Sequence, residues 1–134
     1  MFRRASVIIL KKGSVLLVKL KEQDKLLPRA SWVFPFLNIG EEDSPRKVIN
    51  DFLGKTGLKY AIDQKIFKYN PSENPKLSYI VYVANYLGGE PEISGFFQSY
   101  KWVKIQDITA YSTSFMDGGI SKYLNDIASK VVED

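Results

Sequence analysis

The chain has 134 residues, of which 45% are hydrophobic and 25% charged, and its formal net charge is +4. This length is enough for one domain with a buried core, and the composition is typical of globular proteins. The chain has no cysteine and no histidine, which excludes disulfides, thiolate or imidazole catalysis and Cys- or His-bound metals, so that any metal would be a hard, oxygen-bound ion such as Mg²⁺ or Mn²⁺.

The first predicted element is a β-hairpin over residues 4–20. Two β-branched apolar runs, RASVIIL and SVLLVKL, lie on either side of the turn sequence KKGS. Residues 1–29 carry eight Lys or Arg and only two acids, so this end is either a contact for a phosphate-rich partner or the solvated face of the hairpin. The apolar run before Lys11 is too short for a signal peptide or a membrane span. We therefore expect a cytoplasmic protein without membrane contact.

A polar loop over residues 22–31 precedes an extended segment and a helix. The segment WVFPF, residues 32–36, is extended because the residue before a proline favours β or polyproline conformations. Ser44 is a suitable N-cap and Pro45 suits the first helical position, so a helix begins here. Gly54 or Gly57 ends it. Its buried stripe consists of Val48, Ile49, Phe52 and Leu53.

Three further strands and a closing helix are predicted after this helix. The strands cover residues 65–70, 77–87 and 96–105, and the second has two largely apolar faces, as expected of a central strand. The apolar residues of the amphipathic closing helix are Ile120, Tyr123, Leu124, Ile127 and Val131. This order of elements predicts an α/β (α+β) fold in which a mixed central β-sheet lies between helices.

An acidic turn, residues 41–43, comes immediately before the first helix. Within the helix, Lys47, Asp51 and Lys55 share a face that is not the apolar stripe. One interpretation is a solvated face with two ion pairs, each worth about 0.3–0.5 kcal/mol. The other is that Glu42 and Asp51 hold a divalent cation against a phosphate, because Mg²⁺ often uses one or two carboxylates together with substrate oxygens.

The segment Phe36–Leu58 resembles the box of the Nudix superfamily: Gly, five residues, Glu, seven residues, Arg-Glu, an aliphatic, any residue, Glu-Glu, any residue, Gly, an aliphatic. Without gaps, Glu42 takes the first Glu, Gly57 the late Gly and Leu58 the final aliphatic. The lead-in WVFP and the later segments YLGGEPE and YKWVKIQDI also resemble the family. The likeness spans nearly the whole chain and implies one Nudix-like α/β/α sandwich over residues 1–134.

The box of this chain is degenerate. Phe36 stands for the Gly that lets the backbone approach substrate phosphates, Asn50 replaces the Arg, and Asp51 shortens the adjoining Glu. Gly54 and Lys55 replace the Glu-Glu pair, which supplies metal ligands in the family. An ammonium about 4 Å from a charged site interacts by roughly 4 kcal/mol at an effective dielectric near 20. Lys55 would therefore pair with an acid or bind a phosphate directly, and we expect no cofactor.

The resemblance implies a nucleotide- or RNA-phosphate-binding or assembly module with little pyrophosphohydrolase activity, because some degenerate members of the superfamily bind RNA or are subunits of larger complexes. The residues expected to contact phosphate or nucleic acid are Lys55, Arg3, Arg4, Lys11, Lys12, Trp32, Phe34 and Phe36. For the three aromatic residues, the alternatives are core packing or an apolar homodimer contact.

The alternative function is an active, metal-dependent Nudix hydrolase of a nucleoside diphosphate-linked substrate that uses displaced carboxylates. Its catalytic residues would be Glu42 and Asp51, and it would require Mg²⁺ or Mn²⁺ to activate water. The metal would be held by Glu41, Glu42 and Asp51, together with Asp43 and with help from Glu90 or Glu92 of a later loop. Glu90 and Glu92 are equally interpreted as ordinary turn residues.

Overall fold

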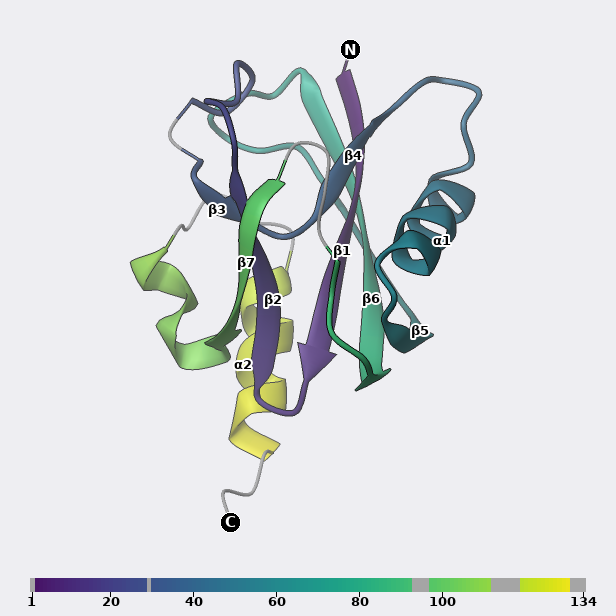
Figure 1. Ribbon diagram of the computed structural model, residues 1–134. Helices are drawn as coiled ribbons and strands as arrows, with labels where there is room; N and C mark the ends of the chain where they lie inside the picture. Colours follow the sequence, from purple (N-terminus) through teal and green to yellow (C-terminus); the bar gives the residue numbers. More distant parts are fainter. Residues whose placement is uncertain (1, 29, 93–96, 112–118, 131–134) are drawn as a thin grey trace.

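The computed structural model describes residues 2–28, 30–92, 97–111 and 119–130. Its elements are β1 (Phe2–Lys11), β2 (Ser14–Leu20), β3 (Trp32–Val33), β4 (Phe36–Ile39), α1 (Pro45–Lys55), β5 (Lys59–Tyr69), β6 (Leu77–Gly88), β7 (Phe97–Lys104), the 3₁₀ helix η1 (Ile105–Ala110) and α2 (Ile120–Lys130). The sheet lies between α1 and α2 (Figure 1). None of the helices in these ranges has the length and apolar character that a membrane span requires.

Strand β1 is the centre of a mixed sheet. It runs parallel to β6, while β4 pairs antiparallel with its first half and β2 pairs antiparallel with its last residues. Strand β2 also pairs antiparallel with β3 and β7, and β5 is the antiparallel neighbour of β6. The predicted α+β fold with a mixed sheet between helices is therefore confirmed.

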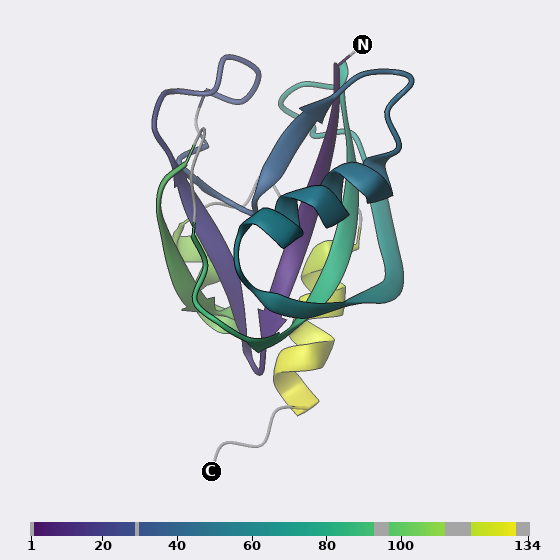
Figure 2. The same cartoon turned by 45° about the vertical axis from the view of Figure 1, so that its right-hand side comes forward.

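Two apolar cores form because successive side chains of β1 point to opposite faces of the sheet. Val7 and Ile9 pack with Ile49 and Leu53 of α1. On the other face, Ile8 and Leu10 belong to the core that includes Ile120 and Leu124 of α2. Figure 2 shows α1 crossing the front of the sheet and α2 lying behind it. Strand β6 also contributes to both cores, which confirms the central strand predicted from its two apolar faces.

Helix α1 begins and ends at the residues that the sequence indicated. Ser44 Oγ accepts a hydrogen bond from the backbone N–H of Lys47 at 3.4 Å, and Pro45 occupies the first helical turn. Gly57 follows the helix with φ +77°, the left-handed conformation that favours glycine, whereas Gly54 lies inside the helix. Asp51 and its lysine neighbours are exposed, but the two ion pairs expected along this face are not formed, since Arg4–Asp24 is the one ion pair in the described ranges.

The bounds of two predicted segments differ clearly from the structure, and one residue of a third segment is not described. Strand β5 begins at Lys59 rather than at residue 65, because a register shift between Ile62 and Ile66 interrupts the alternation from which strands are predicted. The extended segment 32–36 is divided between β3 and β4. Val131, assigned to the closing helix, lies outside the described residues.

Candidate functional site

The acidic turn before α1 is built around its own backbone. Asp43 Oδ2 accepts a hydrogen bond from the N–H of Gly40 at 2.7 Å, so this carboxylate stabilises the turn. Arg3 Nη1 donates to the carbonyl oxygens of Gly40 and Glu41, at 2.8 and 3.2 Å. Glu41, Glu42 and Asp43 are all exposed. The turn therefore presents the carboxylates of Glu41 and Glu42 to solvent. The Arg3 side chain, from β1, is already hydrogen-bonded to backbone carbonyl groups of this turn.

The later acidic residues meet the opposite end of α1. The N–H of Glu92 donates to the carbonyl oxygen of Thr56 at 2.8 Å, which places the loop carrying Glu90 and Glu92 against the residues that end the helix. The helix has 11 residues, and at about 1.5 Å per residue its two ends are roughly 16 Å apart. Across the part of the chain that the structure describes, no three or more acidic residues come together in a way that could hold a metal ion.

Gly54 and Lys55 are exposed near the end of α1. A Cβ added at Gly54 would meet no atom within 4 Å, so the position has room for a glutamate. Crowding therefore does not explain why this position is a glycine. The donor set as it stands does not fit the cluster of anionic oxygens with which a divalent cation would be held for hydrolysis.

Phe36 fills the place where the Nudix pattern has a glycine. Its side chain is buried, and its ring makes edge-to-face contacts with Tyr79 and Phe97, with centroids 6.4 and 6.1 Å apart. The guanidinium carbon of Arg4 lies 4.3 Å from the Phe36 ring centroid, a cation–π contact. A phosphate approaching this backbone would therefore meet an aromatic ring held on several sides.

Arg4 is held by four hydrogen bonds in this part of the structure. Nη1 and Nη2 donate to the two carboxylate oxygens of Asp24 at 2.6 and 2.8 Å. Nε donates to Asn38 Oδ1 at 3.0 Å, and Nη1 also donates to the hydroxyl of Tyr79 at 3.0 Å. Burial disfavours the charged forms, but the bonds and charges of Asp24 and Tyr79 outweigh it and raise the pKa of Arg4. Burial also disfavours ionisation of Asp24, but the hydrogen bonds and charge of Arg4, with the backbone N–H of Leu26, outweigh it and lower the pKa of Asp24.

Arg4 does not lie on the surface as a free cation for a phosphate partner. Its side chain is 4% exposed and already carries a carboxylate on both terminal nitrogens. Sequence analysis missed Asp24, because the residue lies in a segment interpreted only as a polar loop. The available signal was a lone pair of acids, Glu22 and Asp24, within an otherwise basic end of the chain.

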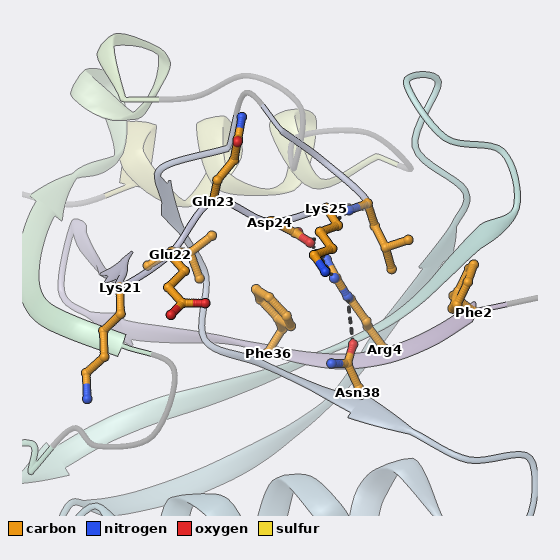
Figure 3. Close-up of a pocket in the computed structure, with 11 residues that line it drawn as sticks. Phe2, Arg4, Lys21, Glu22, Gln23, Asp24, Lys25, Phe36 and Asn38 are labelled. Atoms are coloured by element: carbon orange, nitrogen blue, oxygen red, sulfur yellow. Dashed lines mark hydrogen bonds and ion pairs between the residues drawn. The ribbon is translucent and has the colours of Figure 1, made fainter.

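A pocket of about 650 Å³ opens beside this ion pair (Figure 3). Its apolar lining comes from Phe2, Leu20, Leu26 and Phe36, and its polar lining includes Lys21, Glu22, Gln23, Lys25 and Asn38. Figure 3 shows Asp24 pointing from the loop above towards Arg4, with the Phe36 ring on the floor beside it. An apolar pocket with a few convergent polar groups is the usual form of a small-molecule site.

The predicted basic contacts lie at two ends of the molecule. Arg3 and Arg4 are near the start of β1, while Lys11 and Lys12 are at its hairpin end, roughly 25 Å away at 3.3 Å per residue. In Figure 1 the N-terminus and the β1–β2 turn lie at opposite ends of the sheet. The predicted cations therefore do not make one continuous patch, and Lys55 lies on α1.

The aromatic residues expected to stack on bases belong to the core on the α2 side. Phe34 and Phe36 are buried, and Trp32 is half-buried with its ring 5.8 Å from that of Tyr111. Lys11 Nζ lies over two other rings, those of Tyr86 and Trp102, at 5.0 and 5.1 Å from the centroids. Sequence analysis did not select these two rings, because they lie far from Lys11 along the chain.

Several solved structures resemble this one. A C. elegans Ap4A hydrolase matches with a TM-score of 0.70 and 16% identity over 96% of this chain and 99% of that one. A Streptococcus suis ADP-ribose pyrophosphatase matches with a TM-score of 0.63 and 16% identity, over 98% of this chain and 96% of that one. A Nudix-family hydrolase from Clostridium perfringens matches with a TM-score of 0.64 and 18% identity, over 93% of this chain and 97% of that one.

No family model matches the sequence, and no curated protein does. The sequence identities to the solved structures are low, so the likeness concerns the three-dimensional fold. It extends over almost the full described chain and over almost the full length of those three proteins. The mixed sheet between α1 and α2 is therefore the Nudix fold.

Proposed function

We propose that this chain is a Nudix-fold binding or assembly module that recognises phosphate groups of nucleotides or RNA and has little pyrophosphohydrolase activity. The observation that carries the proposal is the exposed end of α1, where Gly54 and Lys55 stand in place of a carboxylate pair. Two structures with this fold are described as an Ap4A hydrolase and an ADP-ribose pyrophosphatase, which supports a phosphate-linked nucleotide as the class of ligand.

Charge favours phosphate over metal at the end of α1. Hydrolysis by a metal-activated water needs anionic oxygens that hold the ion, and an ammonium in their place repels it. Lys55 ends an exposed helix face and is not ion-paired in the structure. It can therefore act as a point charge for a phosphate oxygen.

The hairpin end supplies the surface for RNA. Lys11 and Lys12 are exposed, and Lys11 lies over the rings of Tyr86 and Trp102. Lysines that neutralise phosphates beside aromatic rings that stack on bases are the usual components of single-strand binding sites. Arg4, with its carboxylate partner and its burial, takes no part in this surface.

Turnover is tested with a panel of nucleoside di- and triphosphates, dinucleotides and ADP-ribose in Mg²⁺ or Mn²⁺. We expect no turnover above that of a buffer blank. Turnover that disappears in the Glu42→Gln variant would contradict the proposal, because it would assign Glu42 a catalytic role. The Glu73→Gln variant, which removes an exposed carboxylate from the loop between β5 and β6, is the matched control.

RNA binding is tested with two charge reversals of equal size. In K11E/K12E, binding of single-stranded RNA should weaken, and the slope of log K against log salt should fall by about 0.7 for each lysine lost. In K68E/K76E, which reverses two exposed lysines towards the other end of the sheet, binding should be retained. Equal binding by both variants and the unchanged protein would contradict the hairpin as the contact.

One observation favours the alternative of an active hydrolase with displaced carboxylates. The hydrogen bond from Glu92 N–H to the Thr56 carbonyl brings the loop with Glu90 and Glu92 to the end of α1. In that case Glu92→Gln or Glu90→Gln would abolish turnover in the same assay. The Glu22→Gln variant, which changes charge at the opposite end of the molecule, would leave it unchanged.

A further inference from the structure

At the wall of the pocket, Asp24 binds Arg4 in the way that an acidic ligand would. The two Asp24 oxygens accept parallel hydrogen bonds from Nη1 and Nη2 at 2.6 and 2.8 Å. This bidentate arrangement is the one by which arginine binds the oxyanion of a carboxylate or a phosphate ligand. Asp24 thus supplies from the chain itself the group that an acidic ligand would bring to Arg4.

The loop that carries Asp24 is held differently in its two halves. Its later half is fixed, because Leu27 is buried and Asn74 Nδ2 donates to the Leu26 carbonyl oxygen at 3.2 Å. In its earlier half, Lys21, Glu22 and Gln23 are exposed. Gln23 Nε2 donates to the Pro28 carbonyl oxygen at 3.2 Å, which holds the earlier half to the later one, and the Asp24 carboxylate holds it to Arg4 of the sheet.

The remaining lining of the pocket suits a ligand with a flat apolar body. Phe2, 54% exposed, and the buried ring of Phe36 contribute to one pocket with Leu20 and Leu26. Stacking and apolar burial would hold such a body, while Lys21 and Lys25 on the same lining favour a negative charge nearby. A negatively charged group of a ligand placed beside the Asp24 carboxylate would be repelled by it.

We propose that Asp24 is an internal counter-ion, and that the pocket binds a ligand with an oxyanion attached to an aromatic ring by exchanging that oxyanion for the Asp24 carboxylate at Arg4. The exchange keeps the buried guanidinium neutralised and hydrogen-bonded. It also frees Asp24 to return to water together with the exposed loop residues 21–23. This inference rests on the proposed recognition of phosphate groups. It adds that the Asp24 carboxylate controls the access of a ligand to Arg4.

Calorimetry with phenyl phosphate, benzoate and inorganic phosphate tests the exchange. The Asp24→Asn variant should bind phenyl phosphate at least about tenfold more tightly than the unchanged protein, because the competing carboxylate is gone. Benzoate separates a carboxylate ligand from a phosphate ligand, and inorganic phosphate shows how much the ring contributes. Glu22→Gln makes the same change of charge in the same pocket without touching Arg4, so its gain in affinity measures the general effect of removing a negative charge, and the gain in Asp24→Asn should exceed it.

Limited trypsin digestion of the unchanged protein gives a second readout that does not depend on the folding of the variant. Millimolar phenyl phosphate should accelerate cleavage after Lys21, because displacement of Asp24 releases the earlier half of the loop. If phenyl phosphate leaves cleavage unchanged, or if D24N binds it no more tightly than E22Q does, the exchange is wrong. Neither assay contains RNA or a divalent metal, so this failure is distinct from failure of the RNA-binding proposal.

Discussion

Arg4 and Asp24 meet across the mouth of the pocket although they are 20 residues apart in the chain. Their side chains are only 4% and 7% exposed, and Arg4 also donates to Asn38 and to the hydroxyl of Tyr79. A buried guanidinium is tolerated because a carboxylate neutralises it. The contribution of this pair to stability therefore depends on whether one partner or both are removed.

Asp24→Asn should lower the free energy of unfolding by about 3 kcal/mol, because breaking one side of a buried pair leaves an uncompensated charge. Urea unfolding measures this, and Glu22→Gln should change stability by no more than about 0.5 kcal/mol. The double variant R4M/D24L should recover much of the loss, since it leaves no buried charge. R4M and D24L are the single variants of this cycle. If the loss of stability in R4M/D24L equals the sum of the losses in R4M and in D24L, the two residues are not coupled.

The stabilisation by Asp24 should disappear in acid. Burial opposes ionisation of the carboxyl, but the hydrogen bonds and charge of Arg4, with the backbone N–H of Leu26, outweigh it and hold the pKa of Asp24 below its ordinary value. A group whose pKa is lowered by folding stabilises the protein above its unfolded pKa, here about 3.9, and loses that contribution as the pH falls through the lower folded value. The stability difference between the unchanged protein and D24N should therefore shrink below about pH 4 in urea titrations at stepped pH.

Gly54 and Gly57 should respond oppositely to alanine. Gly54 is exposed inside α1, and a Cβ there meets no atom within 4 Å, so Gly54→Ala should raise the free energy of unfolding by about 0.5–1 kcal/mol through helix propensity. Gly57 has φ +77°, which an L side chain rarely adopts, so Gly57→Ala should lower it by about 1 kcal/mol. Thermal or urea unfolding measures both, and a loss of stability in Gly54→Ala would mean that position 54 needs glycine.

The parts of the fold that the sequence predicts are those with a regular period and a clear boundary. Helix α1 has a capping serine, a proline and a terminal glycine at the observed places, and β6 has the two apolar faces of a central strand. Strand β5 was predicted too short because the residues between Ile62 and Ile66 interrupt its register. A bulge of this kind is decided by pairing with a neighbour and leaves no periodic signal.

The candidate site was less predictable for one physical reason. The pairing of Arg4 with Asp24 joins β1 to a loop, and no local pattern encodes a contact between them. The separation of Arg4 from Lys11, in contrast, follows from the sequence once the strand is accepted, because an extended chain rises about 3.3 Å per residue. The count of charges shows that the first part of the sequence is basic, and strand geometry then places these basic residues at two opposite ends of the folded molecule.

The resemblance of α1 to the Nudix box can be tested by adding the acids of the family pattern. The double variant G54E/K55E should bind Mn²⁺ measurably by calorimetry, because two carboxylates are added to an exposed helix face that also carries Asp51. The free space at Gly54 predicts that the variant folds normally, and unchanged circular dichroism would establish this. No new heat of binding in a folded G54E/K55E protein would count against the alignment of α1 with the Nudix box.

A control separates a metal site from the general attraction of a more acidic surface. In the G54E/K55E background, Asp51→Asn should remove the Mn²⁺ binding, because Asp51 lies one helical turn before residues 54 and 55. Glu73→Gln makes the same change of charge in an exposed loop far from α1 along the chain, and it should leave binding unchanged. Equal losses in the two triple variants would mean that net charge, and not the geometry of the helix face, attracts the ion.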